Sequence, residues 1–231
     1  MAMSLSPNGV NFYATPDPAD ELLVATQRGI VPADPDTLYV GVEVGGAFKS
    51  TDGGQTFREL SGFYVDVHRL MTTPTRPDDV YMSTGRGLYH SADRGESWEA
   101  WPLGEVGILY PDALVIQPDR PECLFTAGSS SSPGTWPASK DADSRVARSR
   151  DGGKTWERVG SGIPGHLRGN VEAMTMNAHA NGFALFAGTT DGDVFFSDDG
   201  AESWAIVARG LPPVSKSGHY RALQVAAPSA T

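Results

Sequence analysis

Side chains suited to binding an anionic or sugar-like ligand recur in the polar stretches between the apolar runs of this 231-residue chain. They are arginine, histidine, aromatic and carboxylate residues, which form bidentate, hydrogen-bonding or stacking contacts. The candidates are Glu43, Asp66, His68, Arg69, Arg86, Tyr110, Asp112, Trp136, His166, Arg168, Glu172, Asp191, His219 and Arg221, with Tyr220 beside the last two. Arginine would pair with a ligand carboxylate, and Trp136 would stack on a sugar ring. The simpler alternative is that loops collect polar residues, which then pair with one another.

A second set of polar residues forms a motif that occurs four times, Ser-x-Asp-x-Gly-x-Thr/Ser-aromatic. Its aspartates are Asp52, Asp93, Asp151 and Asp199, spaced 41, 58 and 48 residues apart. In each copy an apolar run enters the motif, Asp and Gly turn the chain, and an aromatic residue starts the next strand. We therefore interpret the four carboxylates as structural turn residues and not as catalytic groups. Ala201 stands where the fourth copy needs glycine, so that turn is predicted to be relaxed or differently shaped.

A proline motif about 18 residues before each of the first three copies marks another turn. It reads Pro-x-x-Pro-acid-x-aliphatic-aromatic and begins at Pro32, Pro74 and Pro118, while the fourth unit keeps only its end, residues 184–186. Each unit thus predicts a strand A before the prolines, a strand B after them, a strand C into the Asp motif and a strand D out of it. Four short antiparallel strands in a unit of roughly 40–50 residues are typical of a β-propeller blade.

The four Asp motifs resemble the Asp-box, or BNR, repeat family, which is known from sialidases, sortilin-type receptors, xyloglucanase-like glycoside hydrolases and photosystem II assembly-factor-like proteins. The resemblance spans residues 12 to about 228. It implies an all-β fold, a β-propeller of four-stranded antiparallel blades, with five to seven blades if the propeller is intact. Because the box recurs in enzymes and non-enzymes, the resemblance assigns no activity.

We expect one domain over residues 1–231, and the phase of the motifs sets its blade units. These units are a truncated 11–31, then 32–60, 65–101, 112–159 and 171–207, and a last strand A at 219–228. The first unit aligns from Pro16 on the unit at Pro74, yet the next proline motif follows after 16 residues instead of 42 or 44. About 26 residues are therefore absent between Val31 and Pro32. A deletion, an omitted loop and a naturally shortened blade are the alternatives.

In the propeller that the resemblance implies, the D–A and B–C loops open on one face, at the mouth of the central channel. The candidate ligand-binding residues fall in these loops, whereas the Asp boxes lie on the opposite face. The third B–C connection is expanded from Gly128 to Arg145 and contains Trp136. This stretch is too polar and too rich in Gly, Ser and Pro for a core segment, so we place it on the ligand face.

Two classes of function remain open. The leading hypothesis is a non-enzymatic binding scaffold that holds a small polar or carbohydrate-like ligand, or a protein partner, at the channel mouth. The alternative is a glycoside-hydrolase-like enzyme of the sialidase fold, with Asp66, Asp112 or Glu172 among two carboxylates roughly 5–10 Å apart. No Arg-Ile-Pro or Arg-Leu-Pro string occurs, so no sialidase residue is carried over. The xyloglucanase-like enzymes place their aspartates between two propellers, a cleft that one partial propeller cannot form. An assembly factor with a flat arginine-rich docking patch is a third hypothesis.

Composition excludes several other classes. The net charge of −10 disfavours nucleic acid, and no apolar run is long enough to span a membrane. The single cysteine, Cys123, excludes a disulfide framework and any multi-thiolate metal site. The histidines lack metal-ligand spacing, so neither a metal nor a cofactor is expected. The first ten residues show no signal peptide, which predicts a cytoplasmic protein; a secreted protein with a removed leader is the alternative.

Overall fold

The computed structural model describes residues 34, 36–159, 161–179 and 182–214, and the backbone of residues 10–13 and 23–26. The candidates His219 and Arg221, the predicted strand at 219–228 and the Val31–Pro32 junction lie outside these residues. The chain divides into two compact units. Unit 1 comprises Met1–Leu103, Ile116–Leu124 and Ser149–Thr155, and unit 2 comprises Gly104–Val115, Phe125–Arg148 and Trp156–Thr231.

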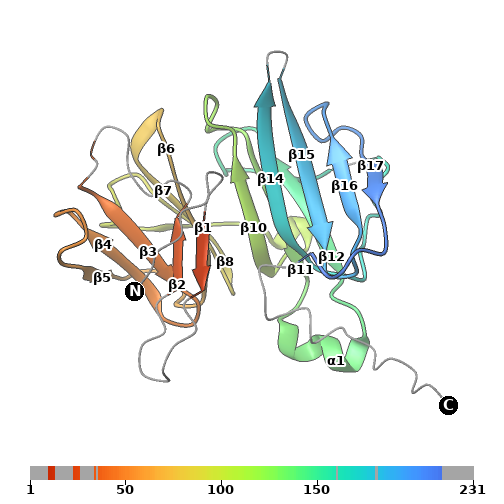
Figure 1. The fold of residues 1–231 in the computed structure, drawn as a ribbon, viewed down its shortest axis with the longest axis horizontal. Helices are drawn as coiled ribbons and strands as arrows, with labels where there is room; N and C mark the ends of the chain where they lie inside the picture. The colour runs from red at the N-terminus through yellow and green to blue at the C-terminus, as the bar shows by residue number, and fades with distance from the viewer. Residues whose placement is uncertain are drawn as a thin grey trace. The chain divides into compact units, whose positions relative to one another are not determined.

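Antiparallel strands that follow one another in chain order build every described sheet (Figure 1). A two-stranded sheet pairs β1 (Val10–Tyr13) with β2 (Leu23–Thr26), and a three-stranded sheet contains β3 (Leu38–Val42), β4 (Gly46–Ser50) and β5 (Arg58–Leu60). Three four-stranded sheets follow. They are β6 (Val67–Thr73), β7 (Arg76–Thr84), β8 (Gly87–Ser91) and β9 (Glu99–Trp101); β10 (Tyr110–Ile116), β11 (Leu124–Ser129), β12 (Ser144–Ser149) and β13 (Glu157–Arg158); and β14 (Val171–His179), β15 (Gly182–Thr189), β16 (Val194–Ser197) and β17 (Ala205–Ala208).

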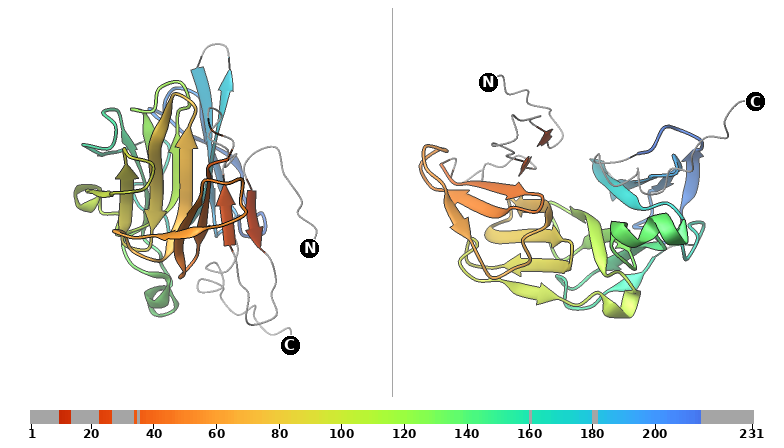
Figure 2. Two further views of the ribbon diagram at one scale, coloured as in Figure 1. Left: turned by 90° about the vertical axis from the view of Figure 1, so that its left-hand side faces the viewer. Right: turned by 90° about the horizontal axis from the view of Figure 1, so that it is seen from below.

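Helical structure is confined to three short segments of the described chain, η1 (Gly104–Val106), η2 (Pro133–Thr135) and α1 (Trp136–Ser139). None of them is long and apolar enough to cross a membrane. The views in Figure 2 show the same strands from two further directions. The predicted all-β class, built from four-stranded antiparallel blades, is therefore confirmed.

Apolar side chains between the strands form the core of each unit. In unit 1, the side chains of Tyr39, Leu60, Val67, Val80 and Met82 are buried in one cluster. All seven residues of β10 are buried, whereas the outer strand β17 alternates between exposed and half-buried positions. This gradient is typical of a blade, whose inner strand has neighbours on both faces and whose outer strand borders solvent.

The four Asp boxes share one hydrogen-bond pattern. In the first, Asp52 Oδ1 accepts the backbone N–H of Thr56 at 2.9 Å, and Asp52 Oδ2 accepts the Thr56 hydroxyl at 2.6 Å. Ser50 Oγ donates to Asp52 Oδ1 at 2.7 Å and accepts the N–H of Gly54 at 2.9 Å. The same contacts recur around Asp93, Asp151 and Asp199. The threonine or serine hydroxyl, followed by the backbone N–H of the same residue, lowers the pKa of each carboxyl to about 2.

The prediction of a relaxed or differently shaped fourth turn at Ala201 is wrong. Ala201 has a φ of +70°, in the same left-handed region as Gly95 at +85° in the second box. Its N–H donates to Ser197 Oγ at 3.1 Å, as the glycine does in the other boxes. The bonds made by Ser197 and Asp199 thus fix the turn in a conformation that alanine adopts only at a cost.

A buried cation joins one sheet to the box of the next sheet within each unit. In unit 1, Lys49 on β4 is 6% exposed and donates to the backbone oxygen of Arg94 at 2.9 Å and to Glu96 Oε1 at 3.0 Å. In unit 2, Arg148 on β12 is equally buried, and it contacts the backbone oxygen of Gly200 and the carboxylate of Glu202. Both cations immediately precede a box serine, and each meets the following box at the same two positions.

Candidate functional site

The loop end of unit 1 is built from one interstrand loop held between two hairpin turns. The loop between β5 and β6 contains Val65 and Asp66. Gly46, which follows the β3–β4 turn as the first residue of β4, donates its N–H to the Val65 carbonyl at 2.7 Å, and Gly85 of the β7–β8 turn donates to the Asp66 carbonyl at 2.9 Å. These two backbone bonds fix the three segments side by side, so residues far apart in sequence form one surface.

Several predicted residues at this end face inward. The imidazole of His68 is fully buried, and its Nε2 lies 3.3 Å from Asp66 Oδ2. His68 and Arg69 belong to β6, so they lie in a strand and not in the loop where they were predicted. Glu43 lies in the β3–β4 turn and is half-buried. A ligand at this surface would therefore meet Asp66 and the turns before it could reach His68.

Arg86 is the predicted residue of unit 1 that does face solvent. Its guanidinium carbon lies 4.3 Å from the centroid of the Tyr64 ring, within the range of a cation–π contact. Sequence reasoning missed Tyr64, together with the exposed Val44 and Val65 beside it. An aromatic residue in a predicted D–A loop was the available signal for Tyr64, since a Tyr outside the predicted strands has no core position to fill.

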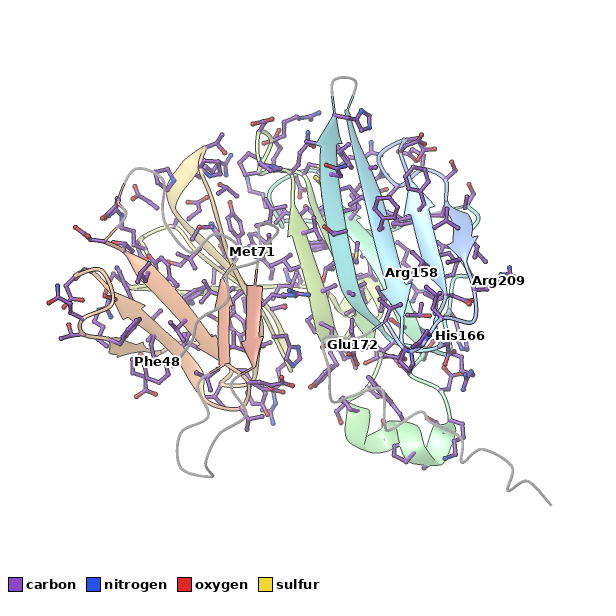
Figure 3. All side chains as sticks on the ribbon, in the orientation of Figure 1. Phe48, Met71, Arg158, His166, Glu172 and Arg209 are labelled. Carbon is purple, nitrogen blue, oxygen red and sulfur yellow. The ribbon has the colours of Figure 1, made fainter. Side chains whose placement is uncertain are left out.

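The loop end of unit 2 brings basic side chains into contact with carboxylates, some of which are predicted residues while others are not. His166 Nε2 lies 2.8 Å from Asp141 Oδ2, and Arg168 Nη2 lies 2.5 Å from Asp191 Oδ1. Arg145 holds Asp143 at 2.7 Å. Figure 3 shows His166 and Glu172 at the end of this unit that faces α1. The polar groups at this end are thus paired with one another, in line with the alternative that loop residues pair with each other.

The local backbone explains why Asp143 takes part in this network. Asp143 has a φ of +50°, and its N–H donates to Asp141 Oδ1 at 2.7 Å, which is an Asx turn. Burial raises the pKa of the Asp143 carboxyl, but hydrogen bonds from Ser130 and Arg145 outweigh burial, so the net pKa is lowered. Asp143 therefore stays an anion that holds the Arg145 guanidinium.

Two candidate catalytic carboxylates are buried beneath this surface. Asp112 on β10 and Glu172 on β14 are both fully inaccessible to solvent. Asn170, which sequence reasoning missed, donates its amide to Asp112 Oδ2 at 2.6 Å and thereby ties the start of β14 to β10. Tyr110 is also buried, at the first position of β10. These residues lie in strand starts, whereas the blade model had assigned them to open loops.

The prediction that Trp136 stacks on a ligand is wrong. Its ring is fully buried against Ala142, and its Nε1 donates to the Ser131 carbonyl at 3.2 Å. The expanded connection folds over this ring through η2 and α1, because an indole removes a large apolar area from water. The connection therefore has a small core of its own, although its composition is that of a loop.

No group of three or more His, Cys, Asp or Glu side chains in the described residues is arranged to hold a metal ion. The two loop ends therefore offer hydrogen-bond donors, ion pairs and apolar surface. In unit 1, the structure brings together Arg86, Tyr64, Val65 and Val44, and in unit 2 it joins Arg168 to Asp191. Such arrangements suit recognition of a polar or amphipathic ligand.

Comparison with known proteins starts from the third box. The BNR/Asp-box repeat model matches residues 147–158, which contain Asp151. The chain carries an Asp-box repeat. Two curated relatives are xyloglucanases: an oligoxyloglucan-reducing end-specific xyloglucanase of Emericella nidulans, 35% identical over 79 residues, and a xyloglucanase of a Paenibacillus species, 27% identical over 152 residues. The matches cover 31% and 56% of this chain but only 10% and 14% of those proteins.

Solved structures extend the likeness to most of the Asp-box chain. The GH74 xyloglucanase from Xanthomonas campestris superposes with a TM-score of 0.59 at 18% identity, over 80% of this chain and 30% of that enzyme. YCF48 from Cyanidioschyzon merolae gives 0.52 at 16% identity, over 90% of this chain and 58% of that protein. YCF48 bound to a D1 peptide gives 0.53 at 14% identity, over 89% and 59%. At these identities the likeness concerns the fold, which is that of β-propeller blades.

Proposed function

We propose that this protein is a non-catalytic binding scaffold whose blade loops recognise a protein segment. The observation that carries the proposal is the burial of Asp112 and Glu172, the carboxylates that a hydrolase at this loop end would use. Glycoside hydrolysis needs two carboxylates roughly 5–10 Å apart that both reach the scissile bond. A carboxylate without solvent-accessible surface cannot reach a polysaccharide.

The charged groups that remain accessible in unit 2 support the same proposal. Asp191 lies 2.5 Å from Arg168 Nη2, and Asp141 lies 2.8 Å from His166 Nε2, so each of these carboxylates has a side-chain partner. These contacts occupy the carboxylate oxygens that a hydrolase would turn toward its substrate. Paired groups of this kind instead offer fixed donors and acceptors around which a partner can be oriented.

The comparisons support binding and also favour a second candidate. YCF48, which shares the fold, has been solved with a bound D1 peptide, so a propeller of this type can hold a peptide. The second candidate is a sugar-processing function, because the 79-residue match at 35% identity is to a xyloglucanase. That match covers a tenth of the enzyme, so it includes at most a small part of any active site. The cytoplasmic location remains a prediction.

Two parallel assays on the whole chain distinguish the candidates. Xyloglucan and xyloglucan oligosaccharides are incubated with the protein, and the release of reducing ends is measured. In parallel, the protein is applied to a synthetic library of dodecapeptides, and retained peptides are titrated individually by fluorescence anisotropy. We expect no reducing ends above the protein-free control and saturable binding of a subset of peptides. Turnover that is lost in Asp66→Asn would overturn the proposal, and so would the absence of any saturable peptide.

A further inference from the structure

The loop end of unit 1 presents apolar side chains to solvent beside an arginine. Val44 is 75% exposed and Val65 is 51% exposed, values that are high for aliphatic side chains of a folded blade. The backbone bond from Gly46 to Val65 holds the two segments together, and Tyr64 precedes Val65 in the same loop. We call Val44, Tyr64, Val65 and Arg86 the valine–arginine patch.

The backbone under this patch is strained. Val44 has a φ of +59°, a conformation that a β-branched residue rarely adopts. Gly45 beside it has no room for a side chain, because a Cβ there would lie 2.4 Å from Val42 Cγ1. Strain of this kind persists only where the surrounding structure fixes it, and it is concentrated at functional positions. The turn thus holds Val44 in an exposed position although isopropyl groups favour burial.

Arg86 is oriented but carries no ion pair within the part of the chain that the structure describes. Its two contacts there are the stack on Tyr64 and the bond from its own N–H to Thr84 Oγ1 at 3.2 Å. By contrast, Arg94, Arg148 and Arg168 each hold a carboxylate. A guanidinium stacked on a ring keeps its N–H edges free and loses little further freedom when it binds a carboxylate bidentately.

The net charge of the chain limits which kinds of partner can bind at this patch. A net charge of −10 repels a strongly acidic segment, so charge complementarity at Arg86 favours one carboxylate and not an acidic run. The exposed valines favour aliphatic side chains beside that carboxylate, since tyrosine and arginine surrounded by apolar contacts are typical of interface hot spots. Xyloglucan, a neutral sugar, would leave both the guanidinium and the valines without a complementary group.

We propose that the valine–arginine patch docks a protein segment that carries an aliphatic residue next to a single carboxylate. This proposal rests on the binding function proposed above and assigns it a surface. The carboxylate comes from a glutamate or aspartate side chain or from a free C-terminus, and it pairs with Arg86. Val44 and Val65 contact the aliphatic side chain, and Tyr64 keeps the guanidinium in place.

The test uses the whole chain and the dodecapeptide library, synthesised with free and with amidated C-termini. We expect the retained peptides to share an aliphatic residue beside one carboxylate. Arg86→Gln and Val44→Ser should each raise the dissociation constant of these peptides by about tenfold or more, as expected for hot-spot residues. Arg120→Gln is the matched control, because Arg120 is 66% exposed and lies in the β10–β11 turn. Retention only of free-acid peptides would identify a C-terminal carboxylate, and retention of amidated ones a side chain.

Both variants are checked by thermal unfolding, since Arg86 and Val44 are exposed and their replacement should leave the melting temperature within a few degrees. Peptides that bind wild type and both variants equally would overturn the proposal that they dock at the valine–arginine patch, but would leave the proposed binding function standing. Retained peptides without a carboxylate would also overturn the patch. If no peptide binds at all, the binding function itself fails, and the patch fails with it.

Discussion

The guanidinium of Arg148 on β12 lies 3.0 Å from the carboxylate of Glu202, which is three residues beyond the aspartate of the next Asp box. The same relationship joins Lys49 on β4 to Glu96 at 3.0 Å. In both pairs the cation is almost completely buried and also donates to a backbone oxygen one residue after the box aspartate. The boxes therefore do more than turn the chain, because two of them also accept a cation from the preceding sheet.

Replacement of this cation should weaken unit 2. Arg148→Met removes bonds to Glu157, Glu202 and a backbone oxygen, and we expect a loss of about 2 kcal/mol in the free energy of unfolding, as for hydrogen bonds to charged groups. Urea unfolding followed by tryptophan fluorescence measures it. Arg120→Met, at an exposed ion pair, is the control and should change the stability by less than about 0.5 kcal/mol. Equal effects of the two substitutions would contradict a structural role for the buried cation.

Acid should destabilise the fold through the box carboxylates. Their pKa in the folded protein is about 2, below the value of about 3.9 for an unfolded aspartate. The folded state therefore binds protons less readily, so the stabilisation is complete above pH 4 and is lost as the pH falls toward 2. We expect the melting temperature to fall across this window. Asp93→Asn should melt lower at pH 7 and show a shallower fall, whereas Asp119→Asn, outside the boxes, should follow the wild-type curve.

Relief of backbone strain in the fourth box should stabilise the protein. Ala201 pays for its left-handed conformation, so Ala201→Gly should raise the free energy of unfolding by about 0.5–1 kcal/mol. The reverse change at the equivalent position, Gly95→Ala, should lower it by about 1 kcal/mol or more. The alanine at position 95 would have to adopt a φ near +85°, and its methyl group would lie 3.2 Å from Leu60 Cδ1. Thermal and urea unfolding of both variants measure whether each change raises or lowers the free energy of unfolding. A destabilised Ala201→Gly would show that loss of the buried methyl group outweighs relief of the strain.

Trp136 should behave as a core residue. Trp136→Ala removes the core of the connection between β11 and β12. We expect the free energy of unfolding to fall by about 3 kcal/mol, either for this connection alone or for the whole fold. Limited proteolysis should then cut between residues 130 and 143, where we expect the wild type to resist. Trp136→Phe, which keeps most of the apolar volume, should remain resistant. Proteolysis that is unchanged in Trp136→Ala would argue against the packing role.

The sequence was sufficient to predict the fold class, because its separate patterns all indicate the same kind of structure. Short apolar runs, paired prolines and the Ser-x-Asp motif all predict short hairpin-linked strands, and the sheets β6–β9, β10–β13 and β14–β17 have that form. The motif chemistry also predicted which side chains accept bonds in the boxes. It did not predict the conformation at Ala201, since a network of hydrogen bonds can impose a backbone that propensity disfavours.

The candidate site was harder to predict, because side-chain direction depends on packing between segments. His68, Asp112 and Glu172 have the residue types of a polar site, but they lie on strands whose residues are mostly buried. Arg86 was predicted, yet its partner Tyr64 comes from another loop and is brought near by bonds between turns. Composition alone also placed Trp136 on the surface, since the few apolar residues of its connection gave no sign of a local core.

Within the described part of the chain, the serine and aspartate side chains of each Asp box bond only within the turn. In the first copy these bonds fall within seven residues, from Ser50 to Thr56. These side-chain bonds are local, but the backbone of the turn also bonds distant residues, since the Gly53 N–H donates to the Asp36 carbonyl at 3.0 Å and the Arg94 N–H to the Asp78 carbonyl at 2.8 Å. The family model finds only the copy at residues 147–158, although all four turns have the same geometry. The fourth copy keeps this geometry with alanine at its glycine position, so the turn persists where one residue of the motif has changed.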